Sequence, residues 1–232
     1  MSLDKFVYTG KDNLEAMREA KNYNNYLISN IIKFLPSKNK NILDFGAGSG
    51  TYAEMLKDLG YRVDCLEPDM ELAKELRSKG FKVFQELEQI KTNSYDLIYS
   101  LNVFEHIKDD VDVASKLKSI ANKDAIILIY VPAFQILYSS MDKLVGHYRR
   151  YDKKRLLNKI GSNNQIILIK YCDPIGYIAA LIFKFIGSKE GTISKGMVRL
   201  YDKFIFPISS LIEKFTSKFF GKNLLLVIRR NS

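Results

Sequence analysis

Apolar residues in the first part of the chain fall into short runs separated by helical patterns. The runs lack period-two alternation, which is typical of strands covered on both faces. Between them, apolar residues recur at intervals of three and four, as on one side of a helix. The predicted strands are Asn41–Phe45, Arg62–Leu66, Phe81–Phe84, Tyr95–Ser100 and Ala125–Val131, and the predicted helices are Asn13–Leu35, Tyr52–Leu59, Asp69–Ser78 and Asp110–Ala121.

Strands that alternate with helices predict parallel strands joined by right-handed crossovers, which is a doubly wound, Rossmann-like α/β fold. Beyond Pro132 the pattern changes to a loop, a helix, a strand, a long helical and aromatic-rich stretch, and a last strand. The helix is expected at Lys153–Lys159 and the strand at Gln165–Lys170. The helical stretch is expected at Pro174–Phe220 and the last strand at Asn223–Ile228. We expect one domain over 1–232, made of an N-terminal helical segment (1–36), a core (37–173) and a helical insertion or lid (174–222).

Composition narrows the class of protein. Of the 232 residues, 47% are hydrophobic and 27% charged, which excludes a disordered chain. Cys65 and Cys172 support neither a disulfide framework nor a cysteine zinc site, and the N-terminus lacks the apolar core of a secretory signal, so we expect a cytoplasmic protein. The apolar stretch Pro174–Gly187 is shorter than the ~20 residues that span a bilayer and contains Lys184. Peripheral contact with the inner face of the membrane through 174–220 stays open.

Charge is unevenly distributed along the chain. Residues 143–232 carry 18 basic and 5 acidic side chains. This excess is either a solvated basic face or a surface that meets an anionic partner, such as a phosphorylated substrate, lipid headgroups or nucleic acid.

A glycine-rich turn, DFGAGSG at 44–50, follows the first predicted strand and opens a helix. Glycines permit a sharp turn and a close approach of a ligand, and the helix N-terminus offers N–H groups to a carboxylate. The spacing is G-x-G-x-G, with Thr51 where the dinucleotide fingerprint has its third glycine. Asp44 would oppose a pyrophosphate but suits a cation. S-adenosylmethionine, with its ammonium, sulfonium and carboxylate, fits this turn better than NAD does.

Glu67 ends the second predicted strand. The carboxyl ends of the first two strands lie side by side in such a sheet, so an acid there can accept both hydroxyls of a ribose. We therefore expect Glu67 to bind the ribose of the cofactor.

The motifs ILDFGAGSG, LEPD and YDLIYSLNVFEHI, in this order and spacing, resemble class I S-adenosylmethionine-dependent methyltransferases over about residues 40–135. The later GHYRRYDKKRL is similar to a bacterial-type subgroup that modifies sugars, lipids and envelope precursors. The resemblance implies a seven-stranded sheet with an antiparallel last strand, here with roughly fifty residues inserted before it. It also implies cofactor contacts by Asp44, Gly46, Ala47, Gly48, Gly50, Glu67, Pro68, Glu86, Leu87, Leu101 and Asn102.

Two histidines, His106 and His147, follow carboxyl ends of predicted strands and are the candidate catalytic residues. Methyl transfer needs alignment of the nucleophile, and a base only where the acceptor is protonated, as a hydroxyl is. The histidines are bases for a hydroxyl, structural hydrogen-bonding groups, or metal ligands together with Glu105. Metal-dependent methyltransferases that resemble this chain tend to have another carboxylate where Asn102 stands, so we expect no metal.

The segment Tyr148–Arg149–Arg150 is the candidate acceptor-binding motif, because arginines can bind a phosphate or carboxylate in a bidentate manner. In the alternative, an arginine pairs with a nearby acid such as Asp142 or Asp152 and fixes the loop. The apolar helical pattern of 174–220 predicts core, a dimer face, a lid or a membrane-surface element. The oligomeric state stays open.

The function expected is methyl transfer from S-adenosylmethionine to a small-molecule or lipid- or sugar-linked acceptor, at oxygen, by in-line displacement. The alternatives are a nucleic-acid methyltransferase, an NAD-dependent oxidoreductase on the same fold, and a cofactor-binding protein without activity. The nucleic-acid alternative is disfavoured because the chain has no Asn/Asp-Pro-Pro-aromatic signature.

Overall fold

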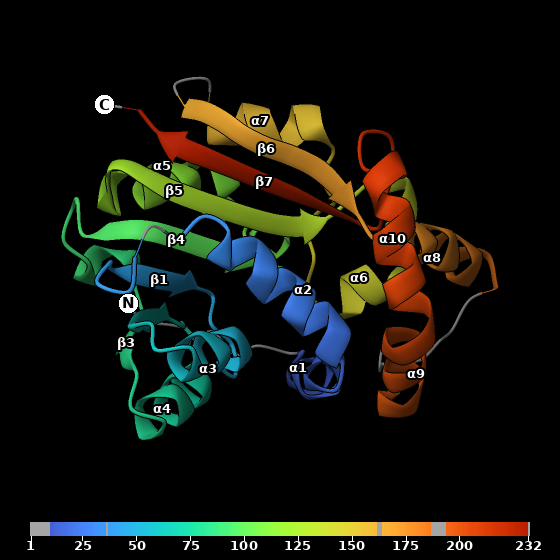
Figure 1. Cartoon of the computed structure of the whole chain (residues 1–232), viewed down its shortest axis with the longest axis horizontal. Coiled ribbons are helices and arrows are strands. Elements are labelled where there is room, and N and C mark those ends of the chain that lie inside the picture. The colour runs from blue at the N-terminus through green and yellow to red at the C-terminus, as the bar shows by residue number, and fades with distance from the viewer. Residues whose placement is uncertain (1–9, 36, 162–163, 187–193, 232) are drawn as a thin grey trace.

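Seven strands form one sheet in the computed structural model, which describes residues 10–35, 37–161, 164–186 and 194–231 (Figure 1). The order across the sheet is β3-β2-β1-β4-β5-β7-β6. The first five strands are parallel, and β7 runs antiparallel to both β5 and β6, which confirms the Rossmann-like class with an antiparallel last strand. The strands are β1 (Ile42–Phe45), β2 (Val63–Leu66), β3 (Lys82–Phe84), β4 (Tyr95–Leu101), β5 (Ala121–Pro132), β6 (Asn164–Cys172) and β7 (Asn223–Arg230).

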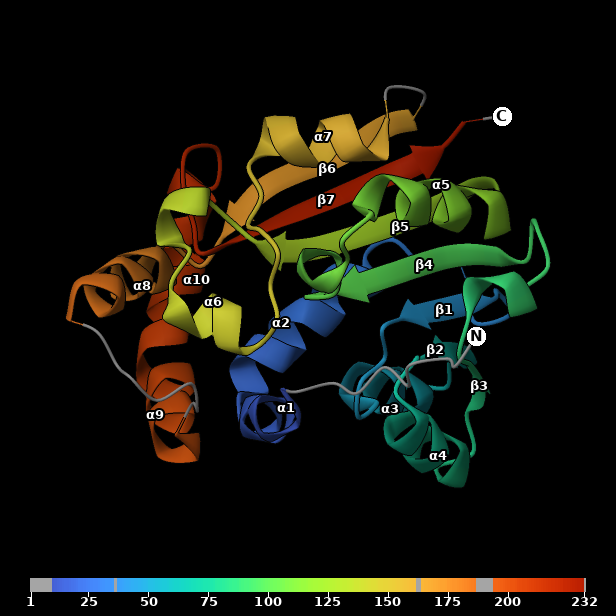
Figure 2. The ribbon, with the colours of Figure 1, turned by 180° about the vertical axis from the view of Figure 1, so that it is seen from behind.

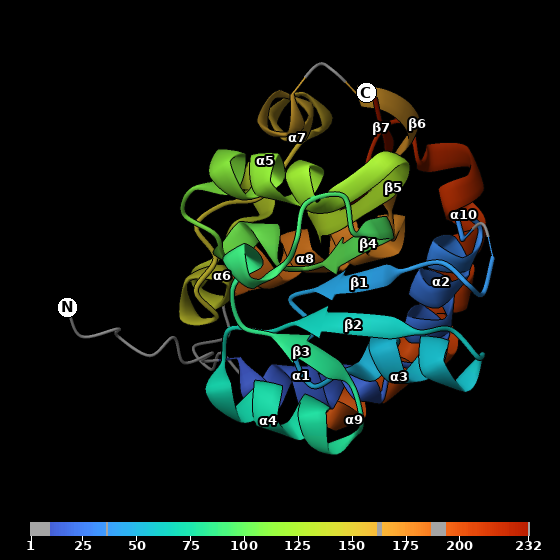
Figure 3. The same cartoon turned by 90° about the vertical axis from the view of Figure 1, so that its left-hand side faces the viewer.

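Helices cover both faces of the sheet (Figures 2 and 3). Successive strand residues point to opposite faces, so an all-apolar strand must be covered twice. Ile42 and Leu97 accordingly pack with the helices of one face, and Leu43 and Ile98 with those of the other. The first face carries α2 (Lys21–Ile32), α3 (Thr51–Asp58) and α4 (Met70–Ser78), and the second carries α5 (Asp110–Ile120) and α7 (Lys153–Ile160).

The single helix predicted over Asn13–Leu35 is wrong, because the chain breaks into α1 (Lys11–Arg18) and α2. The two helices pack on different surfaces: Ala16 lies against Val198, whereas Leu27 and Ile31 lie against the sheet. One straight helix cannot present its apolar residues to both. Residues 1–9 and 36 of the expected N-terminal segment lie outside the described residues.

Smaller boundary shifts follow local pairing. The helix expected to end at Ala121 ends at Ile120, and β5 begins at Ala121 rather than Ala125, because Ala121 already pairs with Tyr95 of β4. The other predicted strands and helices of the core lie within a few residues of their expected positions.

The helices inserted between β6 and β7 pack at one end of the sheet, beside α1 and α2 (Figure 1). They are α8 (Pro174–Ile186), α9 (Lys195–Leu200), a π-helical turn (Tyr201–Ile205) and α10 (Phe206–Thr216). Phe206 lies edge-on to Tyr23 and Tyr26 of α2, and Glu213 pairs with Lys170 of β6 at 2.6 Å. Among the described helices, none has both the length and the apolar character to cross a bilayer.

Asp202 of the π-helical turn supplies the N-terminal cap that α2 lacks. Ala20, the residue at the capping position, has no side-chain acceptor, but the Asp202 carboxylate accepts the backbone N–H groups of Asn22 and Tyr23 at 2.9 and 2.8 Å. Asp202 is buried. The inserted helices are therefore tied to the core by a cap from a distant part of the chain.

Replacement Asp202→Ala should lower the free energy of unfolding by about 1–2 kcal/mol, because two helix N–H groups lose their acceptor. Urea denaturation monitored by circular dichroism measures this loss. The exposed Asp58→Ala is the control and should change stability by less than about 0.5 kcal/mol. Equal effects of the two replacements would contradict this role.

Candidate active site

A cavity of about 1450 Å³ lies at the carboxyl ends of β1, β2 and β4 and extends toward α8 and α9. Gly46, Gly48, Glu67 and Asn102 line its inner end, at the place where open α/β sheets bind ligands. Its outer wall includes apolar side chains of the inserted helices, among them Phe183 and Met197.

The glycine-rich turn has the conformation that its sequence demands. Gly46, Gly48 and Gly50 have φ values of +80°, +54° and +85°, which disfavour any side chain. A Cβ atom on Gly46 would also collide with the side chain of Val103. The N–H groups of Gly46 and Ala47 donate to the Leu66 carbonyl at 2.9 and 3.1 Å, so the turn is held against the end of β2.

Two buried carboxylates flank this turn. Asp44 in β1 is 2% exposed, and its Oδ2 atom has no hydrogen-bond partner among the described residues. Burial raises the pKa of Asp44 to about 7. Glu67 is 5% exposed and accepts the N–H groups of Gly48 and Asp69 at 2.8 and 2.9 Å. Burial also raises the pKa of Glu67, although these two hydrogen bonds oppose the rise.

Most of the residues expected to contact the cofactor lie around one cavity, and the others lie beside it. Asp44, Ala47 and Gly50 do not line the cavity but belong to β1 or to the turn itself. Asn102 follows β4 with a φ of +55°, and its N–H donates to the Tyr130 carbonyl at 2.7 Å. The expected residues that line the cavity are Gly46, Gly48, Glu67, Pro68, Glu86, Leu87, Leu101 and Asn102.

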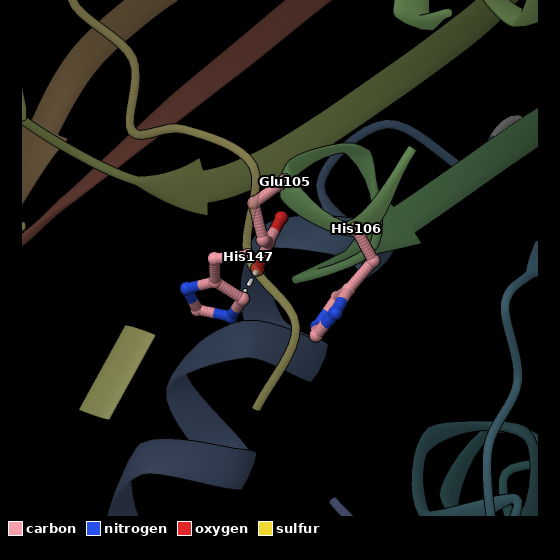
Figure 4. A group of neighbouring side chains, drawn as sticks. All are labelled: Glu105, His106 and His147. Atoms are coloured by element: carbon pink, nitrogen blue, oxygen red, sulfur yellow. Dashed lines mark ion pairs between the residues drawn. The ribbon is translucent and has the colours of Figure 1, made fainter. Parts of the chain in front are cut away.

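The side chains of Glu105, His106 and His147 converge at the wall of this cavity (Figure 4). Glu105 and His106 lie in a 3₁₀ turn (Phe104–His106) after β4, and His147 follows α6 (Ser140–Leu144). Their candidate ligand atoms all lie within 4.8 Å of one another, and the two imidazole rings meet edge-on with centroids 4.5 Å apart. Burial raises the pKa of Glu105 to about 8, and burial together with His147 lowers the pKa of His106 to about 4.

Asp142 fixes the orientation of His147. The Nδ1 atom of His147 lies 2.7 Å from Oδ1 of Asp142. The same carboxylate accepts hydrogen bonds from Nε and Nη2 of Arg150 at 2.9 and 3.0 Å. Although burial raises the pKa of Asp142, the hydrogen bonds from His147 and Arg150 hold it well below its usual range. Because Asp142 accepts, Nδ1 of His147 carries the proton and Nε2 faces Glu105, 3.9 Å from its Oε1.

Both arginines of the candidate acceptor-binding motif form ion pairs within the protein. Arg150 pairs with Asp142, as the alternative interpretation expected, and it also lines the cavity. Arg149 pairs with Asp110 at 2.7 Å, a partner that the sequence did not indicate. Tyr148 is 55% exposed, and neither it nor Arg149 lines the cavity. Acceptor binding by these three residues stays a prediction.

The sequence analysis missed the cavity residues supplied by the N-terminal helices. Tyr23 and Asn24 of α2 line the cavity beside Tyr52 of α3, whose hydroxyl donates to Oδ1 of Asn24 at 3.1 Å. Asn24 is buried. The polar run Asn22–Asn25 in an otherwise amphipathic helix was the available signal, because buried polar groups require partners.

Comparison with known proteins decides the family. A family model described as a methyltransferase domain matches residues 19–164, which is more than half of the chain. The chain belongs to this methyltransferase family. This confirms the predicted S-adenosylmethionine-dependent methyltransferase class and favours it over the oxidoreductase alternative. A comparison with curated proteins finds no match to this methyltransferase.

Solved structures share the fold of this methyltransferase at low sequence identity. An S-adenosylmethionine-dependent methyltransferase from Mesorhizobium loti is 15% identical, covers 87% of this chain and 96% of its own, and has a TM-score of 0.58. The geranyl diphosphate C-methyltransferase of Streptomyces coelicolor was solved with Mg²⁺, geranyl diphosphate and S-adenosyl-L-homocysteine. It is 10% identical, covers 89% of this chain and 79% of its own, and has a TM-score of 0.62. The protein in complex with the Trm112 methyltransferase activator of Haloferax volcanii is 13% identical. It covers 97% of this chain and 98% of its own, with a TM-score of 0.62.

Replacement Asp142→Asn should lower the free energy of unfolding by about 3 kcal/mol, because it leaves the buried Arg150 guanidinium without its charged partner. Urea denaturation near neutral pH measures the loss. Asp112→Asn is the control: Asp112 pairs with Lys116 at the surface and should contribute less than about 1 kcal/mol. Similar losses of unfolding free energy in both variants would contradict a larger contribution from the buried pair.

Proposed function

We propose that the protein transfers the methyl group of S-adenosylmethionine to a hydroxyl oxygen of a small-molecule or lipid- or sugar-linked acceptor. The observation that carries this proposal is the single cavity that joins the glycine-rich turn and Glu67 to the two histidines and to the apolar wall of α8 and α9. Ligand pockets typically measure about 300–1,000 Å³. A cavity of about 1450 Å³ therefore has room for the cofactor and an acceptor together.

The inner end of the cavity suits the cofactor group by group. The turn from Gly46 to Gly50 allows the methionine moiety to approach the backbone, and Asp44 offsets its positive charge. Each carboxylate oxygen of Glu67 accepts one backbone N–H group and keeps a second lone pair, with which Glu67 accepts the ribose hydroxyls. Five further residues line the cavity: in this proposal Pro68, Glu86 and Leu87 contact the adenine, and Leu101 and Asn102 face the methyl group.

The reaction is an in-line displacement at the methyl carbon. A lone pair of the acceptor oxygen forms the new O–C bond while the C–S bond breaks, and the electron pair of that bond neutralises the sulfonium to give S-adenosylhomocysteine. The protein supplies mainly alignment and exclusion of water. The hydroxyl proton must also leave, and His106 and His147 are the cavity residues proposed for this step.

An acceptor with a lipid part is supported by the outer surface of the inserted helices. Phe215 and Phe219 are 80% and 72% exposed, and Lys214 and Lys218 lie exposed beside them. Soluble monomers rarely expose large apolar patches, and basic amphipathic helices favour anionic interfaces. We define this apolar surface as the exposed side chains of the inserted helices that do not line the cavity, namely Ile178, Ile182, Leu200, Phe204, Ile208, Leu211, Phe215 and Phe219.

The experiment that tests this function is incubation of the purified protein with methyl-labelled S-adenosylmethionine and a cell extract. The product is then separated between organic and aqueous phases, and its mass is measured. Label in a product with one added methyl group on oxygen supports the proposal. Label only in nucleic acid, or a product methylated on carbon or nitrogen, would contradict it.

Replacement Glu67→Gln should weaken binding of S-adenosylhomocysteine by about 10- to 100-fold, because a charged acceptor of ribose hydroxyls is worth about 1.5–3 kcal/mol. Isothermal titration calorimetry measures the affinity. Glu71→Gln, on the exposed first turn of α4, is the matched control and should bind as the wild type does. Unchanged affinity of the Glu67 variant would contradict the ribose role.

Replacement Phe215→Glu should reduce binding to vesicles that contain anionic lipid by roughly tenfold, because the phenyl ring no longer enters the interface. Co-sedimentation with the vesicles measures binding. Leu59→Glu, on a surface away from the inserted helices and 46% exposed, is the control. A wild-type protein that stays in the supernatant and forms dimers would instead identify the apolar surface as a dimer face.

A further inference from the structure

The carboxylate of Glu105 is buried without any partner that satisfies it. Its side chain is fully buried, and neither oxygen has a hydrogen bond within the described part of the chain. A buried carboxylate in that state is expensive, and proteins usually supply a hydrogen bond, an ion pair or a metal. The Nε2 atom of His147 lies 3.9 Å from Oε1 of Glu105, and this distance is too long for a hydrogen bond.

His147 is oriented as a metal ligand is. Metal-binding histidines usually donate one ring N–H to a carboxylate, which leaves the other nitrogen free for the metal. Here Asp142 accepts from Nδ1 at 2.7 Å, and the ion pair with Arg150 holds Asp142 in place. The Nε2 lone pair is thereby directed toward Glu105.

His106 completes a set of three ligands around one point (Figure 4). Ligand atoms of a tetrahedral zinc site, at about 2.1 Å from the ion, lie about 3.4 Å apart. The candidate atoms of Glu105, His106 and His147 lie within 4.8 Å of one another, so small rotations of the side chains bring them to this spacing. All three residues line the cavity, which leaves a fourth position open toward it.

We propose that Glu105, His106 and His147 bind one divalent transition-metal ion of the Zn²⁺ type, whose open coordination position takes the acceptor oxygen. Two imidazoles and one carboxylate favour Zn²⁺ or a similar ion over Mg²⁺ or Ca²⁺. The expectation of no metal came from Asn102, but three protein ligands already make a catalytic type of zinc site without a carboxylate at that position. The acceptor part of this inference rests on the proposed function; the metal part does not.

The metal would change how the hydroxyl is activated. A bound ion would lower the pKa of the coordinated hydroxyl, which would then lose its proton to bulk solvent as the acceptor binds and keep a lone pair for the methyl carbon. The two histidines would then be metal ligands, and this role would replace the role as bases that the proposed function gives them. The same coordination fixes the position of the acceptor oxygen relative to the cofactor.

The test is a titration of the full-length protein, freed of metal by a chelator, with Co²⁺ as a probe that absorbs visible light. We expect one equivalent to bind with the intense absorption of a four-coordinate site. Glu105→Gln and His106→Ala should each weaken binding at least tenfold, whereas Glu71→Gln, a matched exposed position, should bind as the wild type does. Circular dichroism shows whether each variant is folded.

Absence of bound Co²⁺ in the wild-type protein would overturn the proposal and does not depend on any variant. Unchanged binding in folded Glu105→Gln and His106→Ala variants would overturn it as well. With an acceptor in hand, chelation should lower turnover and leave binding of S-adenosylhomocysteine unchanged, and Zn²⁺ should restore it. Metal binding without any O-methylation would refute the proposed function and not the metal site, whereas O-methylation that is indifferent to metal would refute the role in acceptor binding.

Discussion

Buried carboxylates at the carboxyl ends of parallel strands are the constraint on which the site depends. Asp44 lies near the end of β1 and Glu67 directly follows the neighbouring β2; both are almost fully buried and have hydrogen-bonding capacity that the protein itself leaves unused. Burial raises the pKa of both carboxyls, because the ionised form is poorly solvated there. Ionisation of the two groups therefore destabilises the folded protein. A ligand that brings a positive charge and hydroxyl groups relieves this penalty, and S-adenosylmethionine brings both.

In the proposed function, the inserted helices supply the acceptor end of the cavity. Asp202 caps α2 across the boundary between insertion and core, so the outer wall of the cavity is anchored to the helix that contributes Tyr23 and Asn24 to its inner part. The wall is apolar where it meets the cavity, and the outer side of the same helices is apolar as well. The proposed cofactor and acceptor sites therefore depend on one connected packing arrangement.

The sequence predicted those features that follow from local pattern. Continuous apolar runs and the glycine spacing were sufficient for the parallel α/β class and for the place of the turn, because strands buried on both faces must be apolar throughout. The break between α1 and α2 was not predictable, since it depends on Val198 and Asp202, some 180 residues away in the chain. The meeting of Glu105 with His147, and the ion pair of Arg149 with Asp110, likewise depend on how a distant loop folds back over β4, whereas the pair of Arg150 with Asp142 is local and was among the expected alternatives.

Calorimetric titration with S-adenosylmethionine, near pH 6 and near pH 7.5, tests the central claim most directly. Because the pKa of Asp44 is raised to about 7, its carboxyl is mostly protonated near pH 6 and must lose a proton before it can stabilise a cation. The account predicts that wild-type affinity is several-fold higher near pH 7.5, and that Asp44→Asn binds more weakly and lacks this rise. No heat at either pH, or the same rise in Asp44→Asn, would contradict it.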